Sequence, residues 1–278
     1  MVTKKMRQIQ VNNFSIGGNQ RFTLMAGPCV IESEKLIFTV AEELKRITDD
    51  LGINFIFKSS FDKANRSSFA SLRGVGLETG LRVLQKVKET YGLPIVTDVH
   101  ESWQCSIVAE VADVIQIPAF LSRQTDLLVA AAQTGRVINI KKGQFMAPWD
   151  MKQVITKCVE SGNDQVLLCE RGTSFGYNNL VVDMRGLIEM RSYGYPVVFD
   201  ATHSVQKPSI NGTTTGGDRK YVSYLMNAAL AIGVDAIFAE VHTSPAEAWS
   251  DAANQLKLSD MRAILTRAVA IDSITKNL

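Results

Sequence analysis

The stretch from residue 93 to residue 117, LPIVTDVHESWQCSIVAEVADVIQI, contains one full cycle of the alternation that decides the fold. Short apolar runs at 95–98 and 114–117 flank a longer amphipathic run at 103–111, where apolar residues recur every three or four positions. Two strand-like runs separated by a helical one are typical of parallel strands joined by a helix. The stretch therefore predicts one β-α-β unit.

The same alternation continues in both directions along the chain. It predicts strands at 22–26, 54–58, 95–98, 114–117, 137–141, 166–170, 197–200 and 236–240. Helices are expected at 33–51, 77–91, 103–111, 124–133, 148–161, 180–192, 218–232 and 259–273. The strand runs are apolar on both faces, as buried parallel strands are. We predict an α/β protein with one domain, a (β/α)8 TIM barrel over residues 22–278, and a short N-terminal cap formed by residues 1–21. An open doubly wound sheet is the alternative.

Composition narrows the class of protein. The 278 residues include 30 Lys and Arg against 28 Asp and Glu, which argues against a nucleic-acid partner. No apolar run approaches the roughly 18 residues that cross a bilayer. The N-terminal basic residues precede no apolar stretch, so we expect neither a membrane segment nor a secretory signal. The four cysteines form no CxxC pair, which favours a reducing, cytoplasmic compartment.

Polar or reactive side chains stand at the carboxyl end of every predicted strand, where (β/α)8 barrels hold their active sites. They are Cys29, Lys58, Asp98, His100, Gln116, Lys141, Arg171, His203, Glu240 and His242. Buried charges are costly unless they are paired or bind a ligand. Such a collection has no purely structural reason, so it predicts an active site at this end of the barrel.

These strand ends carry two kinds of chemistry. One set is cationic and implies a substrate with more than one anionic group: Lys58, Lys63, Arg66, Lys141 and Arg171. The other set offers ligands for a divalent transition metal: Cys29, His203, Glu240 and Asp251. Spacing alone leaves open that the cysteine is a small buried hydrophobe and that the histidine is held by hydrogen bonds. The stretch 207–218, rich in Gly and Thr, is expected to be a loop and a candidate lid.

Eight segments, in order across nearly the whole barrel, carry a family resemblance: 26-AGPCVIES-33, 58-KSSFDKANRSS-68, 97-TDVHE-101, 116-QIPAFLSRQTD-126, 139-NIKK-142, 169-CERG-172, 175-FGYNNLVVD-183 and 199-FDATH-203. They closely resemble the 3-deoxy-D-manno-octulosonate 8-phosphate synthases. The resemblance implies an enzyme of lipopolysaccharide biosynthesis. It would condense phosphoenolpyruvate with D-arabinose 5-phosphate and water, releasing inorganic phosphate.

Two other enzyme classes remain alternatives. The sister family makes 3-deoxy-D-arabino-heptulosonate 7-phosphate from erythrose 4-phosphate. It typically has Lys-Pro-Arg-Thr where this chain has Lys63-Ala-Asn-Arg-Ser67, and this difference favours the five-carbon sugar. A metal-dependent aldolase acting on a sugar bisphosphate is the other alternative.

The resemblance also implies residue roles. Phosphoenolpyruvate would be bound by Lys63, Lys141 and Arg171, with help from Lys58 and Gln116. The sugar phosphate would be held by Asn65, Arg66 and Ser67. The residues expected to act in catalysis are Lys63, Asp98, Lys141, Arg171 and His203. Arg123 is similar to a residue that reaches a neighbouring subunit's sugar-phosphate site, which implies a homotetramer.

The family divides into metal-dependent members with Cys at the position of Cys29 and metal-independent members with Asn there. The resemblance thus implies one divalent metal ion, Zn, Fe, Mn or Co, held by Cys29, His203, Glu240 and Asp251. The text around Asp251 lacks the Asp-Gly-Pro form common in relatives, so this ligand is assigned from its spacing after Glu240.

Overall fold

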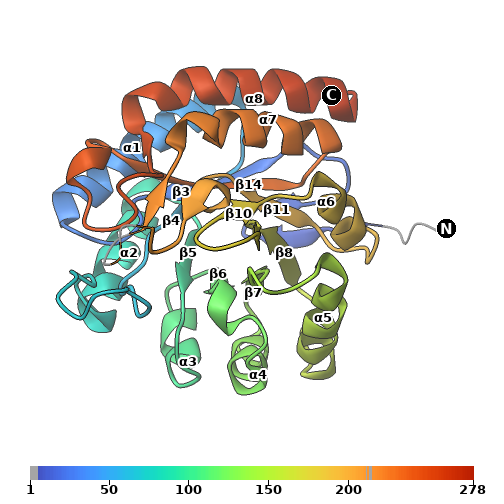
Figure 1. The fold of residues 1–278 in the computed structure, drawn as a ribbon, viewed down its shortest axis with the longest axis horizontal. Helices are drawn as coiled ribbons and strands as arrows, with labels where there is room; N and C mark the ends of the chain where they lie inside the picture. Colours follow the sequence, from blue (N-terminus) through green and yellow to red (C-terminus); the bar gives the residue numbers. More distant parts are fainter. Residues whose placement is uncertain (1–5, 211, 213–214) are drawn as a thin grey trace.

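A closed barrel of parallel strands forms the centre of the computed structural model, which describes residues 6–210, 212 and 215–278 (Figure 1). Its strands are β3 (Thr23–Gly27), β4 (Phe55–Lys58), β5 (Ile95–Asp98), β6 (Val114–Ile117), β7 (Val137–Lys141), β8 (Val166–Glu170), β11 (Val197–Asp200) and β14 (Ala236–His242). Each pairs in parallel with the next, and pairings of β14 with both β11 and β3 close the ring. The predicted (β/α)8 barrel is confirmed, and the open-sheet alternative is wrong.

Helices alternate with the strands and surround the barrel (Figure 1). They are α1 (Glu34–Leu51), α2 (Leu77–Tyr91), α3 (Gln104–Ala109), α4 (Thr125–Gln133), α5 (Met151–Glu160), α6 (Met184–Arg191), α7 (Val222–Ile232) and α8 (Met261–Lys276). Local chemistry fixes the ends of α1. The Ser33 hydroxyl accepts a hydrogen bond from the Leu36 amide at 3.2 Å, and Gly52 ends the helix at φ 64°. Among the described residues, no helix has the length and apolar character needed to cross a bilayer.

The predicted helix at 180–192 is wrong at its start. Leu180–Val181 form a short strand, β10, which pairs with β9 (Thr173–Ser174). The helix begins only after Asp183, whose carboxylate caps it by accepting from the Arg185 amide at 3.0 Å. The predicted starts at 148, 218 and 259 also fall at or within one residue of short 3-10 turns (Pro148–Asp150, Arg219–Tyr221 and Leu258–Asp260) that lead into α5, α7 and α8.

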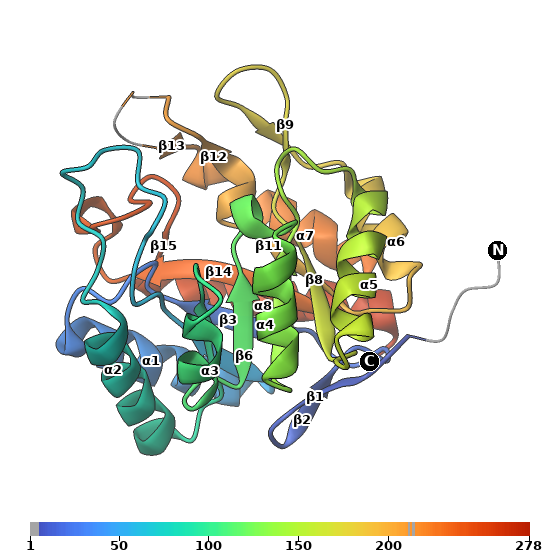
Figure 2. The same ribbon diagram turned by 90° about the horizontal axis from the view of Figure 1, so that it is seen from below.

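A hairpin closes one end of the barrel. Its strands are β1 (Ile9–Val11) and β2 (Phe14–Ile16), and their apolar side chains join the cluster that fills the barrel interior. Figure 2 shows this hairpin at the end opposite β9, β12 (Gln206–Lys207) and β13 (Gly216–Gly217). A domain division at residue 21 stays a prediction, and residues 1–5 of the predicted cap lie outside the described part of the chain.

Strand alternation turns the site residues inward. In β7, Ile138 and Ile140 pack between the barrel and its helices, whereas Val137 lies in the interior cluster. Side chains alternate along a strand, so Asn139 and Lys141 also point into the barrel, toward its carboxyl end. Strands β4, β5, β6, β11 and β14 follow the same pattern, with an apolar inward residue first and a polar one two positions after it.

Candidate active site

A cavity of about 830 Å³ opens at the carboxyl ends of the strands. Most of the predicted site residues line it: Lys58, Lys63, Asn65, Arg66, Ser67, Asp98, Gln116, Lys141, Arg171, His203 and Asp251. Cys29 and Glu240 are fully buried at the ends of β3 and β14, in contact with lining residues. Arg123 is exposed and lies outside the lining. The structure therefore brings together all the residues predicted to bind substrate or metal or to act in catalysis, except Arg123.

Three of the predicted metal ligands lie close together. Donor atoms of Cys29, Glu240 and Asp251 all lie within 4.8 Å of one another. The fourth, His203, places Nε2 at 3.6 Å from Glu240 Oε1 and 3.5 Å from Asp251 Oδ2. Glu240 Oε2 is buried and has no hydrogen-bond partner within the described part of the chain. The cluster thus offers a thiol, an imidazole and two carboxylates, and one carboxylate oxygen is unpaired. This set of ligands fits a divalent transition metal.

Asp200 orients the imidazole of this cluster. It lies at the end of β11 with no exposed surface, and its Oδ1 is 3.0 Å from His203 Nδ1. This contact leaves Nε2 facing the carboxylates, which is the arrangement of a metal-binding histidine. Burial alone would lower the pKa of His203, but the negative charges of Asp200 and Glu240 and the hydrogen bond to Asp200 together outweigh it and hold that pKa above its ordinary value. Without a metal the ring therefore holds a proton more strongly than a free imidazole does.

The same aspartate pairs with a predicted substrate-binding lysine. Lys141 Nζ lies 2.6 Å from Asp200 Oδ2 and 3.9 Å from the centroid of the Phe238 ring. Both partners of the ion pair are buried. Asp200 thus joins the anion-binding and metal-binding halves of the cavity.

Lys58 has a second network of buried contacts. Its Nζ donates to the Cys29 carbonyl at 3.1 Å and to the Ser60 hydroxyl at 3.0 Å, and lies 3.5 Å from Glu240 Oε1. Ser60 in turn donates to Asp98, which is also 3.1 Å from His100 Nε2. Burial and the neighbouring positive charge of Lys63 hold the pKa of Lys58 below its ordinary value. This lysine is therefore a cation that gives up its proton more easily than a surface lysine.

Arg171 presents unused hydrogen-bond donors. It follows β8 and is only 5% exposed. Its Nη2 donates to Gln206 Oε1 at 2.6 Å, whereas Nε and Nη1 have no acceptor among the described residues. An unpaired buried donor costs free energy unless a ligand satisfies it. Because a guanidinium binds phosphate or carboxylate with two parallel donors, these nitrogens fit an anionic substrate.

The predicted sugar-phosphate residues lie at the rim of the cavity. Arg66 donates to the Ser250 hydroxyl at 2.5 Å and to the Trp249 carbonyl at 3.1 Å, so the loop after β14 holds it. The Ser67 hydroxyl is 3.2 Å from that of Ser209, within the predicted lid. Residues 211, 213 and 214 of that lid lie outside the described residues, and its ends form β12 and β13.

Sequence reasoning missed several residues of the site. Asp200 was visible as the last residue of a predicted strand, on the inward side, and this position was the available signal. Ser60 and Gln206 gave no comparable signal, because Ser60 donates to Asp98, 38 residues away, and Gln206 accepts from Arg171, 35 residues away. His242, expected at the strand end, is 3.6 Å from Glu32 and does not line the cavity.

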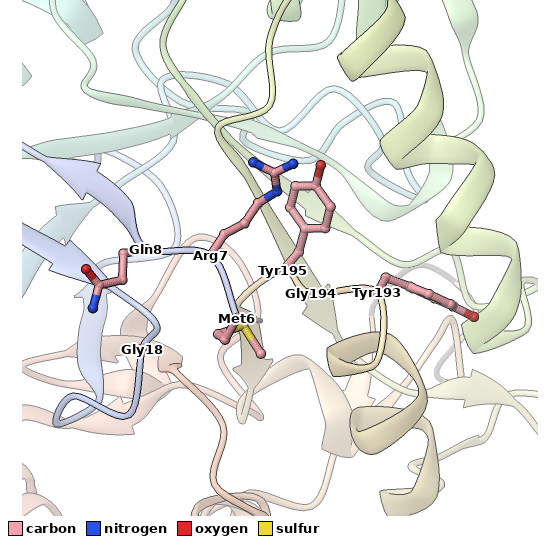
Figure 3. Close-up of a pocket in the computed structure, with 7 residues that line it drawn as sticks. All are labelled: Met6, Arg7, Gln8, Gly18, Tyr193, Gly194 and Tyr195. Atoms are coloured by element: carbon pink, nitrogen blue, oxygen red, sulfur yellow. The ribbon is translucent and has the colours of Figure 1, made fainter. Parts of the chain in front are cut away.

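A second cavity, of about 710 Å³, lies at the hairpin end of the barrel and offers little for catalysis. Figure 3 shows its lining, in which the Arg7 guanidinium lies beside the ring of Tyr195, 5.0 Å from the centroid. Arg7 also pairs with Asp164 at 2.6 Å. Its cation is thus already paired, in contrast to the donors of Arg171.

Comparison with known proteins agrees with this geometry. The sequence profile of the DAHP synthetase I family matches residues 4–277. This chain belongs to that family. A curated protein of Fusobacterium nucleatum is 60% identical over 276 residues, which cover 99% of each chain. A protein of a Cyanothece species is 58% identical over 96% of this chain and 98% of its own. One of Geotalea daltonii is 55% identical over 98% and 100%.

All three relatives carry the name 2-dehydro-3-deoxyphosphooctonate aldolase, a synonym of 3-deoxy-D-manno-octulosonate 8-phosphate synthase. Within the DAHP synthetase I family, the chain is thus a member of the octulosonate branch. The resemblance drawn from the sequence is confirmed.

Proposed function

We propose that this chain condenses phosphoenolpyruvate with D-arabinose 5-phosphate and water, and releases 3-deoxy-D-manno-octulosonate 8-phosphate and inorganic phosphate for lipopolysaccharide biosynthesis. One observation carries the proposal. The two unpaired nitrogens of buried Arg171 share a cavity with Lys141, His203 and Asp251. The other two predicted metal ligands, Cys29 and Glu240, are buried in contact with residues that line it. The names of the relatives support this reaction over the heptulosonate alternative.

In this proposal the floor of the cavity binds phosphoenolpyruvate. Arg171 and Lys141 face its phosphate, while Lys63 and Lys58, with Gln116, face its carboxylate. Lys58 and Lys63 lie 3.5 and 3.6 Å from Glu240 Oε1, which compensates their charge in the absence of substrate. Several cations in one pocket stabilise two anionic groups and hold them against mutual repulsion.

The sugar phosphate would bind nearer the rim. Asn65, Arg66 and Ser67 follow one another in the loop after β4, and all line the cavity. Arg66 is already held by Trp249 and Ser250, so little conformational freedom remains to be lost on binding. The aldehyde end would then lie deeper, near phosphoenolpyruvate and the metal ligands.

A divalent metal ion, Zn, Fe, Mn or Co, would be held by Cys29, His203, Glu240 and Asp251. When bound, it would supply a Lewis acid that orients the aldose carbonyl and its neighbouring hydroxyls. Burial, reinforced by the charge of Glu240, raises the pKa of the Cys29 thiol well above its ordinary value. Metal binding would therefore have to displace a proton from this thiol.

The chemistry is an aldol-like condensation. C3 of phosphoenolpyruvate attacks the aldehyde carbon, water adds to C2, and the tetrahedral intermediate loses phosphate by C–O cleavage. Lys141 and Arg171 stabilise the departing phosphate. Asp98 lines the cavity and is hydrogen-bonded to Ser60 and His100, and in this proposal it takes part in the proton transfers.

Arg123 has a proposed role outside its own subunit. It stands in the short loop before α4, and its carbonyl accepts from Lys157 at 2.9 Å, while its side chain is exposed. We propose that it reaches the sugar-phosphate site of a neighbouring copy in a homotetramer. Mixing Arg66→Ala and Arg123→Ala proteins, each impaired in its use of arabinose 5-phosphate, at a low concentration of that sugar tests this. Shared sites predict partial recovery of activity, whereas no recovery would contradict the shared site.

A direct assay tests the reaction. Loss of phosphoenolpyruvate is followed with arabinose 5-phosphate and, separately, with erythrose 4-phosphate, before and after treatment with EDTA. We expect kcat/KM at least about tenfold higher with the five-carbon sugar, loss of activity after chelation, and its return with Mn²⁺ or Co²⁺. Equal use of erythrose 4-phosphate would favour the heptulosonate synthase, and full activity after chelation would remove the metal from the proposal.

A further inference from the structure

Besides Asp200, a second side chain links the anion-binding side of the cavity to its metal-binding side. Gln206 is the first residue of β12 and is only 8% exposed. Its Oε1 accepts from Arg171 Nη2 at 2.6 Å, and its Nε2 donates to Asp251 Oδ1 at 3.1 Å. Both ends of one amide are thus used, one toward the arginine with unpaired donors and the other toward a predicted metal ligand.

The chemistry of the two partners requires a side chain between them that both accepts and donates, as an amide does. A guanidinium only donates hydrogen bonds and a carboxylate only accepts them. The bridging side chain must therefore offer an acceptor at one end and a donor at the other. This requirement also fixes the orientation of the Gln206 amide.

Arg171 and Asp251 each have further polar atoms, which are not bonded to Gln206 and are available to the proposed substrate and metal. Arg171 keeps Nε and Nη1 without an acceptor among the described residues, on a side chain that lines the cavity. Asp251 turns its other oxygen, Oδ2, toward Cys29 Sγ and His203 Nε2, at 3.5 Å from each. An anion on Arg171 and an ion at Asp251 would therefore lie at the two ends of one hydrogen-bonded chain.

We propose that Gln206 is a positioning residue that couples the binding of phosphoenolpyruvate to the binding of the metal. This inference rests on the proposed function. An anion that fixes Arg171 also fixes the Gln206 amide and, through it, the carboxylate of Asp251. The metal then meets a ligand already in place, so the second binding event costs less conformational entropy. Linkage requires the effect to be reciprocal.

Gln206 also lies where β12 begins, at the base of the predicted lid. Its Cα partner across the short sheet is Gly217, and the Arg219 guanidinium donates to the carbonyl of Ala252, one residue after Asp251. The residues that flank the predicted lid are thus joined to the loop that carries Asp251 at two points.

The experiment measures binding, not turnover. The affinity of the wild-type protein for Co²⁺ is followed by the thiolate-to-cobalt charge-transfer band, with and without phosphoenolpyruvate. The affinity for phosphoenolpyruvate is measured by calorimetry, with and without Co²⁺. We expect each ligand to tighten the other by the same factor, about fivefold or more, as is usual for coupled sites. The variant Gln206→Met keeps the length of the side chain but loses both hydrogen bonds, and its factor should fall at least about threefold.

A matched control separates this chain of bonds from simple attraction between anion and metal. Gln144 also lines the cavity and is 8% exposed, but its side chain is hydrogen-bonded to neither Arg171 nor Asp251. Gln144→Met should keep the wild-type coupling factor. An unchanged factor in Gln206→Met, or no coupling in the wild type, would overturn the inference and leave the reaction intact. A wild type that bound no Co²⁺ would remove both the metal and the coupling.

Discussion

Replacing Asp200 by asparagine removes one negative charge from the interior and changes little else. The carboxylate has no exposed surface, and Oδ2 lies 2.6 Å from Lys141 Nζ and 2.8 Å from His203 Nδ1. Oδ1 accepts from the His203 amide at 2.9 Å. An asparagine that keeps this last bond turns its NH2 group toward two other donors. Lys141 then loses its buried counter-ion.

The size of the effect follows from this geometry. Breaking a buried ion pair by removing one partner typically costs about 3 to 5 kcal/mol, because the remaining charge is uncompensated. For a chain of this size, each kcal/mol lowers Tm by roughly 2 to 4 °C. We therefore expect Asp200→Asn to lower Tm by roughly 6 °C or more and to lower the free energy of unfolding by about 3 kcal/mol.

Thermal and urea unfolding, followed by circular dichroism on wild type and variant, measure this loss. The control is Asp49→Asn, which removes a surface partner of Lys45 in α1 and should change the free energy by no more than about 0.5 kcal/mol. If Asp200→Asn were as stable as this control, the buried charge network would not contribute as described. The variant should also lose most activity, because its NH2 group would replace Oδ2 beside His203 Nδ1 and weaken the contact that orients the ring.

Three further changes test separate parts of the site. Cys29→Ala should abolish metal binding, measured as metal content by mass spectrometry, and most activity. Arg66→Ala should raise KM for arabinose 5-phosphate at least about tenfold while KM for phosphoenolpyruvate stays within about twofold, since only the rim contact is lost. In Gly217→Ala, the new Cβ would meet Asn254 Oδ1 at 1.5 Å, and Asn254 is buried. This overpacking should lower stability by about 1 to 3 kcal/mol in urea unfolding and reduce kcat.

The barrel and its strand-end residues were predictable because their signals are local. Apolar runs mark buried strands, and the alternation of side chains places Lys58, Lys141 and Glu240 on the inward face. This placement does not depend on the exact residue at which each strand begins. The first strand is shifted by one residue from the prediction, yet Cys29 still lies at its carboxyl end because the loop after it is short. Errors of one residue therefore left the site unchanged.

The pairings within the site were not predictable in the same way. Lys141 and Asp200 are 59 residues apart on strands that flank β8 and do not pair with each other, so their contact depends on the order of three strands in the sheet. Asp251 has φ 50°, a turn conformation that no apolar pattern marks, and only its spacing after Glu240 suggested it. The role of Gln206 could not be predicted, because it depends on the contacts with Arg171 and Asp251 that only the structure shows.

The central claim is that one cavity brings phosphoenolpyruvate, a five-carbon sugar phosphate and a metal into reacting contact. Phosphorus NMR of a single mixture of enzyme, Mn²⁺, phosphoenolpyruvate and arabinose 5-phosphate tests it most directly. We expect the phosphoenolpyruvate signal to decline while inorganic phosphate and a new sugar-phosphate ester increase in equal amounts, and no change if either substrate is omitted. Phosphate release from phosphoenolpyruvate alone, or a mixture that stays unchanged with both substrates present, would contradict the account.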